Sequence, residues 1–289
     1  MLKIIAIQGA KGSFHEIATK KFFGSGEVDI LYCQTFLDVF KALESGSASS
    51  AFVAIGNNRY GDIDHVYDIL IANRLSSNTT KYWISGEVYI NIEHHLIGLK
   101  GARVEDIKEV HSQAPAIVQC FSFIHRDLNK AVAIEEDDTA LSAKYVAEWD
   151  DKTKAAIASK EAAKIYGLSV LADNIQDDEN NITRFLLVEP NEDTRIDNAS
   201  KTSLLLRTSH TPGALSEALN LFTKNDINLS YLQSVPIANR PFEYRFYIDI
   251  DGGIENKAVD MALSGLRKLG YQYDILGSYK RATVPKIRP

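Results

Sequence analysis

Residues 175–188 read IQDDENNITRFLLV, so the chain passes here from a polar loop into an apolar run. The apolar end of this stretch, residues 185–188, is typical of a buried strand. Polar side chains at the mouth of such a strand lie where a rigid sheet can present them to a cleft. Thr183 and Arg184 occupy this position. Taken alone, the stretch is equally compatible with a loop-to-strand junction that has no chemical role.

The composition is that of a globular protein. The chain has 289 residues, of which 45% are apolar and 24% charged, and this length is enough for two or three compact units. The net charge of −6 argues against a nucleic-acid-binding protein, which would carry a basic surface. It also means that an anionic substrate would need local cations at its site.

The two cysteines, Cys33 and Cys120, are too few and too far apart for a disulfide framework or a metal site. We interpret both as reduced thiols, and Cys120 as core packing rather than a nucleophile. The first residues lack the layout of a signal peptide, and no apolar run approaches membrane length. These features predict a cytoplasmic protein.

Short apolar strands alternate with helices in the first part of the chain, which indicates an α/β fold with a largely parallel sheet. Strands are predicted at 2–7, 28–32 and 51–55, and helices from Ser13, Thr35 and Asp62. Two glycines release the backbone before Ser13, which fits a capping box with Glu16. Such a helix start suits an anion, although a tight turn without a ligand is the simpler interpretation.

The middle of the chain continues this alternation and builds a second lobe. Strands are predicted at 84–92, 110–112 and 155–159, and helices at 115–125, from 138 and at 160–166. The strand that contains Thr183 then returns to the first lobe. His94 and His95 are adjacent, and neighbours on a strand point to opposite faces, so a shared metal ion is disfavoured.

The C-terminal part has its own pattern. Residues 190–201 are polar, contain Pro190 and are interpreted as a linker. Beyond them, strands and helices follow in the order βαββαβ, with strands at 203–207, 228–236, 244–250 and 271–276. This order is the ferredoxin-like plan.

Several motifs together resemble prephenate dehydratase with a C-terminal ACT domain, and the resemblance covers nearly the whole chain. The family's signature D-x-x-x-N-x-T-R-F is matched by Asp177, Asn181, Thr183, Arg184 and Phe185. Residues 9–18 resemble G-P-x-G-T-F-S-E-x-A, residues 54–61 resemble P-I-E-N-S-x-x-G, and residues 112–120 resemble S-H-P-Q-A-L-x-Q-C. The G-A-L motif of ACT domains stands at 213–215.

The chain also departs from these motifs. Gly56 stands where the family has Glu, which removes a carboxylate from an active-site loop. Other replacements are His15 for Ser, Gln113 for His, Asp138 for Ser, and Gln233 and Val235 in the E-S-R-P motif.

The resemblance implies a bilobal catalytic domain like the type II periplasmic binding proteins, followed by a ferredoxin-like ACT domain. The catalytic domain is expected at 1–189, with lobe 1 at about 1–80 and 175–189 and lobe 2 at about 81–174. The linker is expected at 190–201 and the ACT domain at 202–280. ACT domains commonly pair edge to edge, so a homodimer or homotetramer is expected.

The implied reaction converts prephenate to phenylpyruvate with loss of water and CO2, in phenylalanine biosynthesis, without a metal or other cofactor. The implied catalytic residues are Thr183, Arg184, Phe185, Asn181 and His15. Those implied for substrate binding are Lys11, Ser13, Asn57, Asn58, Arg59, Ser112, Gln119 and Thr139. Those implied for a phenylalanine effector are Gly213, Ala214, Leu215, Gln233 and Ser234.

In this scheme the Thr183 hydroxyl donates a hydrogen bond to the departing ring hydroxyl, and His15 or a water relays the proton. Arg184 or Lys11 holds a substrate carboxylate. Three alternatives stay open: a prephenate decarboxylase, an arogenate dehydratase-like enzyme and a ligand sensor without turnover.

Overall fold

The computed structural model describes residues 2–63, 66–75, 82–190, 196–237, 240 and 242–287. Contacts divide the chain into an N-terminal unit, residues 1–66, 88–185 and 283–289, and a C-terminal unit, residues 67–87 and 186–282. Residues 67–87 therefore group with the C-terminal unit, and the domain boundaries expected from the sequence stay a prediction. Within the expected linker, residues 191–195 lie outside the described residues.

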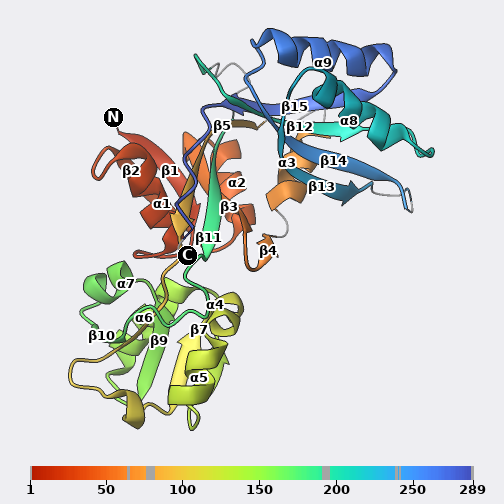
Figure 1. Cartoon of the computed structure of the whole chain (residues 1–289). Coiled ribbons are helices and arrows are strands. Elements are labelled where there is room, and N and C mark those ends of the chain that lie inside the picture. Colours follow the sequence, from red (N-terminus) through yellow and green to blue (C-terminus); the bar gives the residue numbers. More distant parts are fainter. Residues whose placement is uncertain are drawn as a thin grey trace. The chain divides into compact units, whose positions relative to one another are not determined.

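The first sheet of the N-terminal unit has the strand order β5-β11-β3-β1-β2. Strand β1 pairs in parallel with both β2 and β3, and α1 and α2 lie beside this sheet (Figure 1). Ile5, Ala6 and Ile7 of β1 and the apolar side chains of β3 are buried and form the core here. The elements are β1 (Lys3–Gln8), α1 (Phe14–Phe23), β2 (Val28–Cys33), α2 (Phe36–Glu44), β3 (Ser50–Asn57), β4 (Gly61–Asp62), β5 (Trp83–Asn91) and β11 (Ile182–Glu189).

A second sheet in the same unit has the order β10-β6-β9-β7-β8. The chain enters it after β5 and returns to the first sheet in β11, so the predicted bilobal arrangement with two crossings is confirmed. The strand predicted at 84–92 was assigned to the second lobe, whereas β5 pairs in the first sheet. Its elements are β6 (His95–Gly98), a 3-10 turn (Val104–Asp106), β7 (Glu109–Ser112), α4 (Ala114–Gln119), α5 (Phe121–Asp127), β8 (Val132–Glu135), α6 (Thr139–Trp149), β9 (Lys154–Ala158), α7 (Lys160–Ile165) and β10 (Ser169–Ala172).

Two predicted helices differ from those observed. The helix predicted at 115–125 is divided at Cys120, whose φ of −114° and ψ of 21° leave the helical region while its side chain fills the core. The helix predicted from Asp62 is wrong in its start, because Asp62 pairs with Gly56 in a short hairpin. Helix α3 spans Val66–Leu75, and residues 64–65 lie outside the described residues.

The C-terminal unit confirms the predicted βαββαβ order. Its sheet has the order β13-β14-β12-β15-β5, and both α8 and α9 cover the face that carries Leu204, Leu206, Ile248 and Ile250 (Figure 1). Strands β15 and β5 meet at Gly277 and Ile84, where a β-carbon on residue 277 would collide with the Ile84 carbonyl oxygen. The elements are β12 (Lys201–Arg207), α8 (Ala214–Lys224), β13 (Leu229–Pro236), β14 (Tyr244–Asp251), α9 (Lys257–Lys268) and β15 (Gln272–Tyr279).

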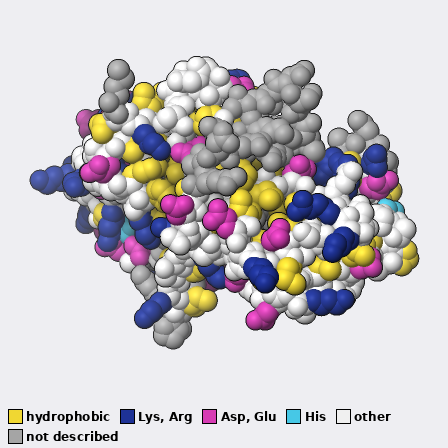
Figure 2. Space-filling view, turned by 90° about the horizontal axis from the view of Figure 1, so that it is seen from above, with side chains coloured by type: hydrophobic (Ala, Val, Ile, Leu, Met, Phe, Trp, Pro, Cys, Tyr) yellow, Lys and Arg dark blue, Asp and Glu magenta, His cyan; other side chains and the backbone are white. Residues whose placement is uncertain are grey.

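The surface charges are mixed in sign. On the face shown in Figure 2, acidic and basic side chains are interspersed rather than gathered into a field of one sign. Among the described residues, no helix combines the length and apolar character that crossing a membrane would need.

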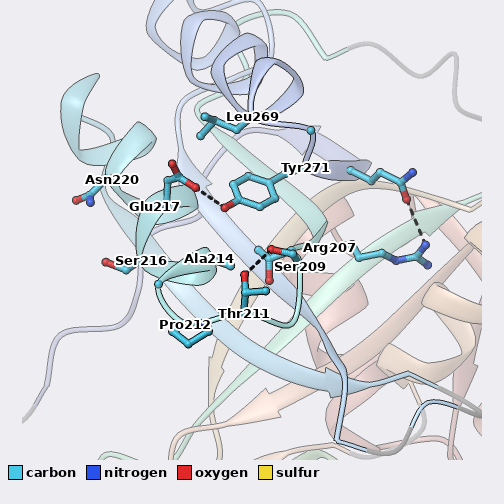
Figure 3. A pocket seen from close by; sticks show the side chains of 14 residues that line it. Arg207, Ser209, Thr211, Pro212, Ala214, Ser216, Glu217, Asn220, Leu269 and Tyr271 are labelled. Atoms are coloured by element: carbon cyan, nitrogen blue, oxygen red, sulfur yellow. Dashed lines mark hydrogen bonds between the residues drawn. The ribbon is translucent and has the colours of Figure 1, made fainter.

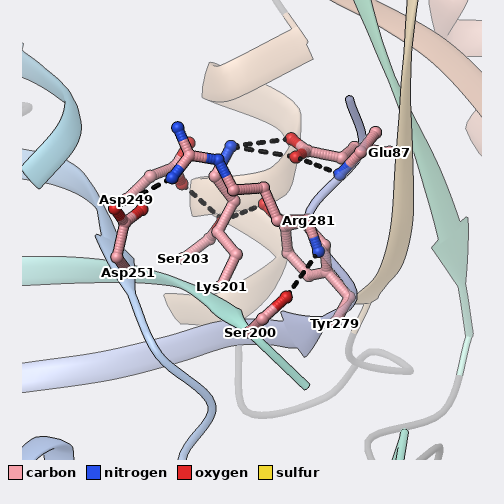
Figure 4. Close-up of polar contacts among 9 residues, drawn as sticks. Glu87, Ser200, Lys201, Ser203, Asp249, Asp251, Tyr279 and Arg281 are labelled. Atoms are coloured by element: carbon pink, nitrogen blue, oxygen red, sulfur yellow. Dashed lines mark hydrogen bonds and ion pairs between the residues drawn. The ribbon is translucent and has the colours of Figure 1, made fainter. Parts of the chain in front are cut away.

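A buried ion pair joins β5 and β12 within the C-terminal unit (Figure 4). The Lys201 Nζ lies 3.0 and 2.9 Å from the two carboxylate oxygens of Glu87, and the two side chains are 2% and 0% exposed. The backbone N–H of Ala282 also donates to Glu87 Oε1, at 3.1 Å. Charges removed from water to this degree are retained only when each has its partner.

Replacing the lysine by Lys201→Met would leave the Glu87 carboxylate buried without its counter-ion. We expect this to reduce the free energy of unfolding by about 3–5 kcal/mol, measured by urea denaturation. Adding Glu87→Gln should recover part of the loss, because the amide oxygen still accepts from Ala282. As a control, Arg281→Gln breaks a more exposed pair with Asp251 and should cost less than about 1 kcal/mol. Equally small effects of Lys201→Met and Arg281→Gln would contradict this expectation.

Candidate active site

A pocket of about 390 Å³ lies within the N-terminal unit and is lined by residues of both its sheets. The first sheet and its connections contribute His15, Asn57, Thr183 and Phe185. The second contributes His94, Gln119, Asp138 and Thr139. Six of the residues expected for catalysis or substrate binding therefore meet at one place: His15, Asn57, Gln119, Thr139, Thr183 and Phe185.

The Thr183 hydroxyl has a defined orientation because Asn57 is fixed by the backbone. The N–H groups of Arg59 and Tyr60 both donate to Asn57 Oδ1, each at 2.8 Å. Asn57 Nδ2 must therefore be the donor to Thr183 Oγ1 at 2.8 Å and to Asn181 Oδ1 at 2.7 Å. Since Thr183 Oγ1 accepts from Asn57, its own hydrogen remains for donation to another group.

The same hydrogen bonds continue to the second sheet. Asn181 Nδ2 donates to Gln119 Oε1 at 2.7 Å, and His94 Nε2 lies 2.9 Å from that oxygen. Asn181 is fully enclosed and does not line the pocket, so it acts as a link between Asn57 and Gln119.

His15 is held as a neutral ring. Its Nε2 accepts the backbone N–H of Ala54 at 3.1 Å, and Phe36 and Phe185 pack edge to face against it. Burial lowers the pKa of His15 to about 3. The Nε2 lone pair is thus already used, and the imidazolium form is disfavoured near neutral pH.

Asp138 is a pocket residue that was not among those expected from the sequence for catalysis or substrate binding. Its Oδ1 accepts the N–H groups of Ala140 and Leu141, at 2.8 and 2.9 Å, at the start of α6. Burial raises its pKa above the ordinary value, against backbone hydrogen bonds that lower it. Gly9, at φ +103°, leaves space for this carboxylate, because a β-carbon there would lie 2.8 Å from Asp138 Oδ2. The replacement of the family's Ser by Asp138 was the available signal.

The remaining expected residues do not line this pocket. Arg184 follows Thr183 on β11, so its side chain lies on the opposite face of the strand. Ser112 donates to the Ile157 carbonyl oxygen at 2.7 Å and is a structural contact. Lys11 is exposed in the loop before α1.

Ser13, Asn58 and Arg59 have local partners. Ser13 caps α1 by accepting from Glu16 N at 3.3 Å, as predicted, but the Glu16 carboxylate returns to Gly12 N rather than to the N-cap residue itself. Asn58 Oδ1 accepts from Ile182 N at 2.7 Å and so holds the start of β11. Arg59 pairs with Asp178 at 3.2 Å at a separate small pocket.

The residues expected to bind an effector do not all line one pocket of the C-terminal unit. Gly213 and Ala214 line a polar pocket of about 770 Å³ at the start of α8 (Figure 3). Leu215 lines a neighbouring pocket, and Gln233 and Ser234 on β13 line neither.

Comparison with known proteins identifies relatives of this chain. A family model described as prephenate dehydratase matches residues 5–193. The chain is 36% identical to arogenate dehydratase/prephenate dehydratase 1 of Arabidopsis thaliana, over 95% of this chain and 71% of that protein. It is 32% identical to the bifunctional chorismate mutase/prephenate dehydratase of Aquifex aeolicus, over 96% of this chain and 74% of that protein.

Two solved structures share the fold of this chain. The crystal structure of prephenate dehydratase in complex with L-Phe from Arthrobacter aurescens has a TM-score of 0.83 and 29% identity, over 99% of this chain and 93% of that one. A structure described as a quorum-quenching acylase has a TM-score of 0.84 and 29% identity, over 97% and 98% of the chains. The family match includes the Asn57 loop and the Thr183 strand, and the chain belongs to the prephenate dehydratase family.

Proposed function

We propose that this protein is a prephenate dehydratase that forms phenylpyruvate in phenylalanine biosynthesis. The observation that carries the proposal is the Thr183 hydroxyl, which accepts from Asn57 and keeps its hydrogen for a ligand in the pocket. Family membership supplies the substrate class.

The reaction breaks two bonds of prephenate. The carbon–oxygen bond of the ring hydroxyl breaks with its electron pair going to oxygen, which takes a proton and leaves as water. The bond to the ring carboxylate breaks to release CO2, and its electrons complete the aromatic ring. Thr183 donates a hydrogen bond to the departing oxygen, which stabilises the charge that develops there. Because the pKa of a threonine hydroxyl is high, the proton of the product water comes from solvent.

The two substrate carboxylates need donors other than cationic side chains. Among the described residues that line the pocket there is no lysine or arginine. Helix α1, of 10 residues, begins at the pocket wall with Phe14 and His15. The positive end of its dipole, and those of its first N–H groups that the Ser13 cap does not use, favour an anion there. At α6, by contrast, the Asp138 carboxylate already occupies the first N–H groups.

Removing the hydroxyl by Thr183→Val, which keeps the side-chain shape, should lower kcat by about 10²–10⁴-fold. Thr183→Ser keeps both the acceptor for Asn57 and the donor for substrate, and should stay within about tenfold of the wild type. Phenylpyruvate formation from prephenate near neutral pH measures both. Full turnover by the valine variant would remove Thr183 from the mechanism.

The reaction product distinguishes prephenate dehydratase from the three alternative functions. A decarboxylase would release CO2 but retain the ring hydroxyl, an arogenate dehydratase would form phenylalanine from arogenate, and a sensor would bind prephenate without turnover. The relatives include enzymes described as arogenate dehydratases, so both substrates belong in the assay.

We also propose that the pocket at the start of α8 binds an amino-acid effector, phenylalanine in the first instance. Glu217, whose Oε2 accepts from the Tyr271 hydroxyl at 2.6 Å, offers a carboxylate for the ammonium group (Figure 3). The N-terminus of the 11-residue helix α8 favours the carboxylate. A relative was solved with L-Phe bound, which supports this choice of ligand.

Glu217→Gln should weaken L-Phe binding about tenfold or more, because a hydrogen bond to a charged group contributes about 1.5–3 kcal/mol. Titration calorimetry measures this, with Glu255→Gln at the start of α9 as the matched control. If the wild type gives no heat with L-Phe, the effector assignment is wrong.

A homodimer or larger assembly, formed in the cytoplasm, also stays a prediction. Strand β13 lies at one edge of the C-terminal sheet and carries half-exposed Leu232, which supports edge-to-edge pairing of two copies. Sedimentation at micromolar concentration should therefore give at least twice the chain mass of 32.1 kDa. A strictly monomeric protein would contradict it.

A further inference from the structure

The direction of each hydrogen bond between Thr183 and His94 follows from the backbone. Two N–H groups donate to Asn57 Oδ1, so Asn57 Nδ2 donates to Asn181 Oδ1. Asn181 Nδ2 then donates to Gln119 Oε1. An amide oxygen only accepts, so the remaining bond to Gln119 Oε1 must come from a hydrogen on His94 Nε2.

This assignment determines what His94 Nδ1 can do. A neutral imidazole with its hydrogen on Nε2 carries a lone pair on Nδ1 and accepts hydrogen bonds there. The neutral form is favoured, because burial lowers the pKa of His94 to about 4. His94 is 3% exposed and lines the pocket, and its Nδ1 is enclosed without a hydrogen-bond partner in the described part of the chain.

An enclosed acceptor without a partner is rare in folded proteins and calls for an explanation. The His94 ring is also fixed in orientation, with Gln119 on one nitrogen and the edge of Phe14 at a ring-centroid distance of 5.5 Å. The His94 ring is therefore held in place at the wall of the proposed active site, and its Nδ1 lone pair has no donor among the residues that the structure describes.

We propose that His94 Nδ1 accepts a hydrogen bond from the ring hydroxyl of the substrate, which makes His94 a catalytic residue; this rests on the proposed function. At neutral pH prephenate carries carboxylates, a keto group and a single hydrogen-bond donor, the ring hydroxyl. An acceptor in the pocket wall can match prephenate only through that group.

The contact persists as the reaction proceeds. When the carbon–oxygen bond breaks, the departing oxygen takes a proton from solvent and leaves as water, which keeps an O–H group that donates to His94. His94 accepts this hydrogen bond without taking the proton, so its ring stays neutral throughout. Because Nδ1 is enclosed, the bond forms only as the pocket wall adjusts around the substrate, and it contributes to kcat more than to KM.

Two variants test the roles of the two ring nitrogens of His94 separately. His94→Gln places an amide near the Nε2 position, where it can still donate to Gln119, but leaves no acceptor near Nδ1. His94→Asn places an amide oxygen near the Nδ1 position and loses the bond to Gln119. The proposal predicts about a 10²-fold loss of kcat in His94→Gln, with a smaller change in KM, and a loss within about tenfold in His94→Asn.

The reverse order, with the glutamine variant the more active, would mean that His94 only supports Gln119 and would overturn the proposal. Equal losses in the two variants, or unchanged kcat in both, would overturn it as well. The wild type is assayed first: if it forms no phenylpyruvate, the proposed function has failed rather than the role of His94.

A second measurement needs no variant. Nitrogen-15 NMR of histidine-labelled wild-type protein at neutral pH should show His94 with a hydrogen on Nε2 and none on Nδ1. A hydrogen on Nδ1 would overturn the proposal, whatever the two variants do.

Discussion

Two backbone N–H groups, those of Arg59 and Tyr60, set the direction of every side-chain hydrogen bond that joins Thr183 to His94. They hold the Asn57 amide in one orientation, and the amides of Asn181 and Gln119 follow from it. A network in which each member has one allowed direction keeps these hydrogen-bond directions when the pocket wall adjusts around a ligand. Such preorganised dipoles are the main source of electrostatic stabilisation in active sites.

This constraint depends on a long-range contact between two loops. Asn57 ends β3, and Asn181 and Thr183 stand at the start of β11, more than a hundred positions later. Neighbouring Asn58 holds the two segments in register, since its N–H donates to the Ile182 carbonyl oxygen while its own Oδ1 accepts from Ile182 N. The returning strand therefore lies beside β3 with Thr183 next to Asn57. This contact between Asn58 and Ile182 therefore brings the residues of the site together.

The sequence predicted those parts of the molecule that depend on local pattern. Hydrophobic periodicity and turn chemistry predicted the caps at Ser13 and Thr35, the βαββαβ order and the strand that follows Asn181. The sequence did not predict that Arg184 lies outside the pocket. Strand residues alternate between two faces, and the sequence alone does not say which face of β11 borders the pocket. In the sequence, His94 was considered only for a shared metal site with His95, which was disfavoured. Its role in the pocket could not be predicted, because the direction of its hydrogen bonds depends on partners from three other segments. The ion pair of Lys201 with Glu87 joins segments 114 positions apart, and neither residue has a local signal.

The departures from the family motifs change the side chains of the pocket wall without disturbing Thr183. Gly56 does not line the pocket; its role is the backbone pairing with Asp62. The carboxylate that the family has at this position is absent, but Asp138 brings another into the pocket wall from the second sheet. Likewise, His15 places a neutral ring where the family has a serine hydroxyl. This ring accepts a hydrogen bond from Ala54 N and packs against aromatic side chains. Both exchanges alter the pocket wall and leave intact the hydrogen bonds that orient Thr183. In the proposed reaction they therefore bear on substrate choice rather than on the departure of the hydroxyl.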